Sequence, residues 1–156
     1  RIGFLVGAMT LLVSAIITGG IGPWLPGQMI TAGWVGQSAI LVTFLVNKFA
    51  WRGKPVEIIL LSGFGGLWGI LYGAIMNLWF WPFLGAGAGQ TFSHNAGALE
   101  NLQRYVAYYL ATSLVWDIMR AVGNILIISI MTASVLKVFQ RFKQRFSFQI
   151  QGEPEQ

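Results

Sequence analysis

The sequence predicts an all-α integral membrane protein built as a helical bundle, and two observations carry that prediction. Of the 156 residues, 55% are hydrophobic and only 10% are charged, whereas an ordinary soluble domain has roughly 25% charged residues. So few charges cannot cover the surface of a soluble core. In addition, four largely apolar runs reach or approach the roughly 20 residues that cross a bilayer core. Soluble folds and disordered chains are therefore excluded.

The first three predicted spans have clear end signals. Residues 2–18 carry no charge and lead into a segment with three glycines and Pro23, where a helix should stop. The second span, residues 29–47, leads into the basic stretch Lys48–Lys54, which Pro55 closes. The third, residues 57–82, begins after that proline and ends at Pro82. These three runs predict transmembrane helices.

The fourth run, residues 104–138, is too long for one perpendicular span at about 1.5 Å per residue, so we expect its first turns outside the hydrocarbon. Residues 1–148 would form a single transmembrane domain, followed by a polar tail at 149–156. Because the chain opens with Arg1 rather than Met, we expect that its start is missing.

The basic residues indicate the topology. Arg1, the Lys48–Lys54 stretch and the Lys137–Arg145 stretch flank alternate span ends. The positive-inside rule assigns all three to the cytoplasm, together with the C-terminus. Basic clusters beside a span attract anionic lipid. The net charge of +5 therefore predicts the bilayer as partner and no nucleic acid.

Small residues recur along two spans. Gly65, Gly69, Gly73 and Asn77 follow at every fourth position, so they share one helix face, and residues 3 and 7 repeat the pattern. Such stripes allow close helix packing in lipid. They predict packing within the chain or a docking surface for another subunit, and the sequence leaves both open.

Asp117 and Arg120 lie inside the fourth apolar run. Each charge costs about 2.5–3.5 kcal/mol at the centre of a span, so the two side chains, three residues apart, should face each other. They are candidates for a ligand site, a proton path or a structural ion pair. Asn124 extends the same polar stripe, and Asn77 could reach it from the third span.

Aromatic and polar residues gather on the predicted outer side. They are either interfacial anchors or the walls of a small-ligand pocket. The candidates are Trp24, Gln28, Trp79, Trp81, His94, Asn95 and Tyr108. With no Cys and a single His, we expect no metal site and no cofactor. No catalytic constellation is present, and the Gly85–Gly89 run predicts a flexible outer loop.

Three blocks of this sequence resemble the substrate-binding S components of energy-coupling-factor (ECF) transporters. The blocks are Gly19–Gly36 (GGIGPWLPGQMITAGWVG), Asn77–Phe83 (NLWFWPF) and Ala111–Ala121 (ATSLVWDIMRA). The resemblance implies a six-helix protein of the bacterial cell membrane, of which this chain would hold the last four helices. It also points to Trp24 and Gln28, to Asn77, Trp79 and Trp81, and to Asp117 and Arg120 as candidate ligand contacts.

The resemblance further implies a function. Such subunits capture a vitamin or related micronutrient from the outer side. They associate with a transmembrane coupling subunit and two cytoplasmic ATPases, so the chain itself would be no enzyme. Cobalamin, thiamin precursors and riboflavin all suit an aromatic pocket, and the resemblance leans towards cobalamin. Two rival hypotheses are a self-contained proton- or ion-coupled carrier using Asp117 and Arg120, and a structural membrane subunit without a ligand.

Overall fold

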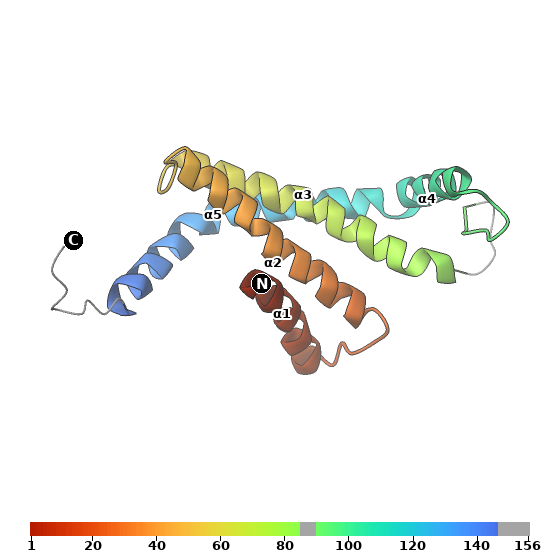
Figure 1. Cartoon of the computed structure of the whole chain (residues 1–156), viewed down its shortest axis with the longest axis horizontal. Coiled ribbons are helices and arrows are strands. Elements are labelled where there is room, and N and C mark those ends of the chain that lie inside the picture. The colour runs from red at the N-terminus through yellow and green to blue at the C-terminus, as the bar shows by residue number, and fades with distance from the viewer. Residues whose placement is uncertain (85–89, 147–156) are drawn as a thin grey trace, which may run out of the picture.

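The computed structural model describes residues 1–84 and 90–146, and the regular elements within these ranges are all helices (Figure 1). The elements are α1 (Ile2–Thr18), α2 (Leu25–Lys48), α3 (Pro55–Phe80), the 3-10 turn η1 (Trp81–Phe83), α4 (Ala98–Thr112) and α5 (Leu114–Phe146). The predicted Gly85–Gly89 loop and the tail at 149–156 lie outside the described residues.

Glycine and proline set the helix ends. α1 ends at Gly19, whose φ of 68° is the left-handed conformation that glycine adopts without strain. α2 begins at Leu25, four residues before the predicted start, because Pro26 fits the first turn of a helix. Pro55 opens α3 for the same reason.

Among the described residues, three helical segments are long and apolar enough to cross a membrane: Leu25–Lys48, Pro55–Phe83 and Leu114–Phe142. The coarse prediction of a helical membrane protein is therefore confirmed. α1 is a shorter apolar helix of 17 residues, so a fourth span stays a prediction.

The structure divides the fourth predicted run into two helices. α4 ends at Thr112, and Ser113 has φ −125° and ψ −26°, outside helical values. The predicted run 104–138 therefore covers the end of α4 and much of α5. The apolar helix begins at Leu114, and the expectation that the turns before it lie outside the hydrocarbon stays a prediction.

The helices form two packed pairs. α1 packs along α2 and α3 packs along α5, while the contact between α2 and α3 is much smaller; in Figure 1 the α1/α2 pair diverges from the α3/α5 pair. In the first pair, a Cβ on Gly7 would overlap the carbonyl of Ala32, and one on Gly3 would overlap that of Gly36. The glycines of α1 therefore serve packing within the chain.

The structure separates Arg1 from the other basic stretches along the helix axes, and its cytoplasmic side stays a prediction. Because Gly3 contacts Gly36, halfway along α2, Arg1 lies level with the middle of α2 and not at the end that carries Lys48. The other two basic stretches do share an end of the molecule. A cavity of about 310 Å³ there is lined by Arg52 and, from α5, by Leu136 and Gln140 among others.

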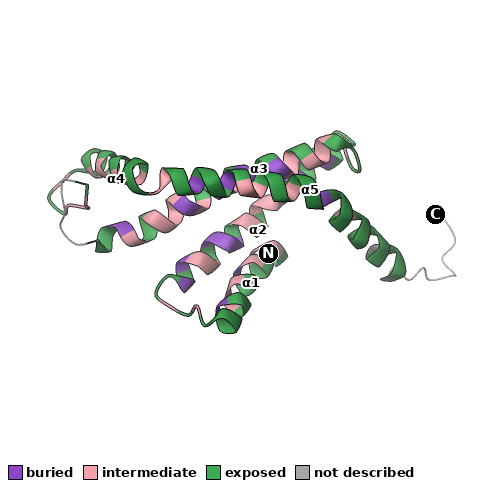
Figure 2. Ribbon diagram, turned by 180° about the vertical axis from the view of Figure 1, so that it is seen from behind, coloured by how far each residue is buried: buried purple, intermediate pink, exposed green. Residues whose placement is uncertain are grey.

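Exposed positions lie along every helix (Figure 2), and many of them are large apolar residues. Trp116, for example, is 69% exposed and Ile130 is 76% exposed, values that burial in a soluble core would not produce. The buried positions are mostly small residues at the helix contacts. Large apolar residues outside and small residues inside are the pattern expected of helices whose outer faces contact lipid and whose inner faces contact each other.

Candidate functional site

A glycine-lined groove on α3 receives α5. Gly65, Gly69 and Gly73 are buried. A Cβ on Gly69 would lie 2.6 Å from the Cα of Ala121, and one on Gly73 would overlap the carboxylate of Asp117. The predicted packing face is therefore confirmed, and its partner is the polar stripe of α5.

Asp117 and Arg120 form the predicted ion pair. Asp117 is 2% exposed, and its Oδ1 accepts a hydrogen bond from Nη1 of Arg120 at 2.6 Å. The same Nη1 lies 3.5 Å from the carbonyl oxygen of Gly69. The Arg120 side chain is 45% exposed, and its guanidinium carbon lies 5.9 Å from the ring centroid of Tyr72. The aspartate is thus enclosed, while the arginine reaches outward.

Two polar atoms beside this pair are buried and lack a hydrogen-bond partner among the described residues. They are Oδ2 of Asp117 and the hydroxyl of Tyr109. Tyr109 lies on α4, before the apolar span begins. Burial, and after it the neighbouring Asp117 carboxylate, raises the pKa of Tyr109 to about 12. The hydroxyl therefore keeps its proton at neutral pH and remains a donor.

Further polar contacts continue along the α3/α5 interface. The Asn124 side chain donates to the carbonyl of Gly65 at 3.0 Å, and the hydroxyls of Ser62 and Ser129 lie 2.8 Å apart. The expectation that Asn77 reaches Asn124 is wrong. Residue 117 faces residue 73 and residue 124 faces residue 65, so this antiparallel alignment places residue 77 beyond the opposite end of the stripe.

A hollow of about 390 Å³ opens beside the ion pair, between α2, α3 and α5. Phe64, Trp68 and Tyr72 form one wall, and Arg120 and Asn124 supply its polar groups. The remaining lining residues are Val35, Gly65 and Ile128. The three rings follow at every fourth residue of α3, next to the glycine stripe. That spacing was the signal for this wall, which the sequence analysis missed.

Two contacts of Trp68, one to α2 and one to its neighbour Phe64, hold the aromatic wall in place. Nε1 of Trp68 donates to the hydroxyl of Ser38 on α2 at 3.0 Å. The Phe64 ring meets the Trp68 ring edge-on, with centroids 6.5 Å apart. This arrangement fixes the wall before any ligand is present, which reduces the conformational entropy lost on binding.

A second aromatic cluster lies where α3 ends and α4 passes. Trp81 is 4% exposed, and its ring meets those of Phe92 and Tyr105 edge-on at 5.5 and 5.4 Å. Its Nε1 donates to the carbonyl of Gln90 at 2.8 Å. His94 is exposed but places its ring 5.0 Å from Phe92. Two predicted site residues, Trp81 and His94, thus share one cluster.

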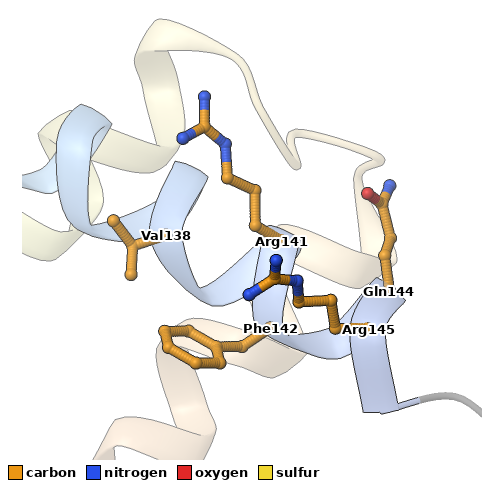
Figure 3. A pocket seen from close by; sticks show the side chains of 5 residues that line it. All are labelled: Val138, Arg141, Phe142, Gln144 and Arg145. Atoms are coloured by element: carbon orange, nitrogen blue, oxygen red, sulfur yellow. The ribbon is translucent and has the colours of Figure 1, made fainter.

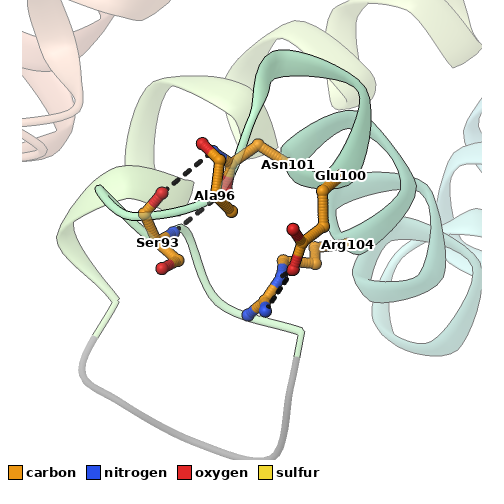
Figure 4. Close-up of polar contacts among 5 residues, drawn as sticks. All are labelled: Ser93, Ala96, Glu100, Asn101 and Arg104. Carbon is orange, nitrogen blue, oxygen red and sulfur yellow. Dashed lines mark hydrogen bonds and ion pairs between the residues drawn. The ribbon is translucent and has the colours of Figure 1, made fainter.

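Asn101 attaches the segment before α4 to the helix (Figure 4). Its Oδ1 accepts the N–H of Ser93 at 3.0 Å, while its Nδ2 donates to the carbonyls of Ser93 and Ala96 at 2.9 and 3.1 Å. Glu100 and Arg104 form an ion pair of 2.7 Å on the same helix. The segment carrying Phe92 and His94 is therefore tied to α4.

The other predicted site residues lie apart from these groups. At the start of α2, Trp24 donates to the carbonyl of Gly20, Gln28 is half-buried, and a Cβ on Gly27 would lie 3.0 Å from the Trp79 ring. Tyr108 and Asn77 are half-buried, and Asn95 is exposed. The candidates therefore fall into separate groups, and Arg120 alone of them lines the hollow on α3.

Comparison of the chain with protein-family models, curated proteins and solved structures gives no match.

Proposed function

We propose that this chain is the membrane-embedded substrate-binding part of an ECF-type importer. It captures a vitamin or related micronutrient from the outer side of a bacterial cell membrane. A transmembrane coupling subunit and two cytoplasmic ATPases complete the importer and drive uptake. In this topology the C-terminus is cytoplasmic.

The observation that carries the proposal is the hollow of about 390 Å³ between three helices. Its size falls within the roughly 300–1,000 Å³ of small-molecule sites. An apolar, aromatic wall with a few convergent polar groups is the composition of such sites. The three sequence blocks that resemble S components, Gly19–Gly36, Asn77–Phe83 and Ala111–Ala121, support the same conclusion.

Each side of the hollow has a role in this proposal. Trp68 and Tyr72 present ring faces or edges to a flat ligand. Asn124 and the exposed part of the Arg120 guanidinium donate hydrogen bonds to its acceptor atoms. Asp117 does not touch the ligand; its buried carboxylate positions Arg120 through their 2.6 Å contact. The Trp81 cluster covers the end of α3 from which the ligand approaches.

The experiment is a thermal-shift screen of the detergent-purified chain against B vitamins and their precursors. A ligand at 100 times its dissociation constant stabilises the protein by about 2.7 kcal/mol, which such a screen detects. One vitamin that raises the Tm supports the proposal and names the substrate. No shift across the panel contradicts it.

A variant set then locates the site. Trp68→Ala should weaken binding of the identified vitamin at least about tenfold, because a stacking wall is lost. Ser38→Ala removes the hydrogen bond to Trp68 but keeps the Trp68 ring. Trp116→Ala is the control, because it removes a tryptophan that is 69% exposed on α5. Equal losses in all three variants would reject the hollow as the site. Loss in Trp81→Ala alone would place it in the cluster at the end of α3.

A second candidate is a self-contained proton- or ion-coupled carrier. It is favoured by the buried Asp117 carboxylate next to the Tyr109 hydroxyl, because Oδ2 of Asp117 and that hydroxyl have no hydrogen-bond partner in the described part of the chain and ionisable groups inside spans commonly mark ion paths. Uptake into ATP-free vesicles that follows an imposed proton gradient, and that Asp117→Asn abolishes, would favour the carrier over the importer subunit.

A third candidate is a structural membrane subunit. Most polar groups of the α3/α5 interface bond across it, as Asn124 and the Ser62–Ser129 pair show, so helix packing accounts for them without a ligand. This function predicts that no small molecule copurifies with the chain and that no vitamin shifts its Tm.

A further inference from the structure

One side of α2 is exposed along most of its length. α1 contacts α2 at Gly36, and Trp68 of α3 donates to Ser38 on another side of the helix. At about 3.6 residues per turn, a third side of α2 lies roughly a quarter turn or more from either contact. This side, which we call the free face of α2, consists of five exposed residues: Ile30, Trp34, Gln37, Leu41 and Phe44.

The free face has the spacing of a contact between two helices. Its residues follow one another at intervals of four, three, four and three. Apolar residues with a mean repeat of about 3.5 insert between the side chains of a neighbouring helix, both in coiled coils and in membrane bundles. A hollow of about 450 Å³ beside the face leaves room for such side chains. It is lined by Trp34, Gln37, Ser38, Ile40, Leu41 and Trp68.

Gln37 is the polar residue of the free face. It stands halfway along α2, a helix that is long and apolar enough to cross a membrane. Its side chain is exposed and forms no hydrogen bond or ion pair with another described residue. A carboxamide has two donor hydrogens and an acceptor oxygen, and leaving these groups in hydrocarbon without a partner is unfavourable. The free face therefore needs a partner that bonds an amide at the middle of the span.

Polar side chains near the end of a helix do not have the same need. Arg141, Gln144 and Arg145 line a hollow of about 560 Å³ in the last turns of α5 (Figure 3). Long polar side chains at such a position can extend to headgroups or water, which a side chain at mid-span cannot reach. Gln37 thus differs from them, because only another polypeptide can satisfy its amide.

We infer that the free face of α2 is a dimer interface, and that its partner is the same face of a second copy of this chain. Two copies inserted in the same orientation bring their α2 helices together in parallel, so identical positions face each other at the same depth. The amide of Gln37 is both donor and acceptor, and it therefore bonds reciprocally with its counterpart. A different helix would have to supply a polar group at that depth.

The residues of the face have separate roles in the dimer. The pair of Gln37 side chains fixes the register, as a single polar position does in a coiled coil. Ile30, Trp34, Leu41 and Phe44 pack above and below this pair. The inference is independent of the proposed transport function, because the free face and the hollow on α3 lie on different sides of α2.

The test measures self-association of the detergent-purified full chain by sedimentation equilibrium in density-matched micelles. We expect a reversible dimer that Gln37→Leu weakens about tenfold, because the amide bonds are lost. Gln37→Asn keeps the carboxamide and should retain most of the association. The matched control is Gln103→Leu, the same substitution at an exposed position of α4, which should leave the association unchanged.

Cross-linking in lipid vesicles then locates the interface. The chain has no native Cys, so each introduced Cys reports its own position. Leu41→Cys should form disulfide-linked dimers on mild oxidation, whereas Leu67→Cys, at a position 57% exposed on α3, should stay monomeric.

Three results would overturn the inference. A native chain that stays monomeric at every protein-to-detergent ratio would leave the free face to a different helix. Equal association of the native chain and Gln37→Leu would show that the amide takes no part. Cross-linking through Leu67→Cys in place of Leu41→Cys would put the contact between copies on α3.

Discussion

Gly73 is the residue on which the burial of Asp117 depends. A side chain there would occupy the space of the carboxylate, so Gly73→Ala should lower the free energy of unfolding by about 1–3 kcal/mol. The matched control is Gly63→Ala on the same helix, where a Cβ meets nothing within 4 Å. Reversible unfolding in mixed micelles measures both, and equal effects would refute the groove.

The Asp117–Arg120 pair allows a second prediction. Arg120→Leu leaves a buried carboxylate unpaired and should lower the free energy of unfolding by about 3–5 kcal/mol. The double variant Asp117→Asn/Arg120→Leu removes both charges and should recover more than half of that loss. The same unfolding assay measures this cycle, and additive effects would show that the 2.6 Å contact contributes nothing.

At the scale of single residues, the sequence predicts contacts within one helix better than contacts between two helices. The Asp117–Arg120 pair follows from a spacing of three residues, and the glycine face of α3 from a spacing of four. The partner of each glycine depends on how α3 and α5 align, which local spacing does not specify. For this reason Asn124 meets Gly65 rather than Asn77.

At the scale of elements, the attachment of the segment before α4 rests on one side chain. Asn101→Ala removes three hydrogen bonds to Ser93 and Ala96. We expect the Ser93 amide to exchange with deuterium at least tenfold faster, because its acceptor is gone. The exposed neighbour Gln103→Ala is the control. Unchanged exchange in Asn101→Ala would mean that ring contacts alone hold the segment.

Helix positions were predictable where composition changes sharply. The first predicted span matches α1 at both ends, Pro55 begins α3, and Pro82 lies in η1 directly after α3 ends. The division between α4 and α5 was not predictable from the apolar run, because neither Gly nor Pro marks it. Likewise, the aromatic candidates were identified by their predicted side of the membrane, a signal that cannot tell which of them share a contact.

At the scale of the whole molecule, the small α2/α3 contact predicts that the two pairs move relative to each other. The chain contains no native Cys, so spin labels report only from chosen sites. Labels at Val13 and Ile127, one on each pair, should give a broad distance distribution that a bound vitamin narrows. Labels at Val13 and Ile30, both on the α1/α2 pair, should give a narrow one. Two equally narrow distributions without a ligand would show a single rigid body.

The α3/α5 contact also bears on how the protein is made. α1 and α2 are joined by a short turn, so their glycine contacts can form as soon as both helices have left the ribosome. The groove of α3 then stays unoccupied while α4 is synthesised, because its partner α5 comes later in the chain. α5 brings Asp117 and Arg120, whose insertion is unfavourable until that groove receives the carboxylate. We therefore expect α3 to assist membrane integration of α5, so that biogenesis depends on the order in which these helices emerge.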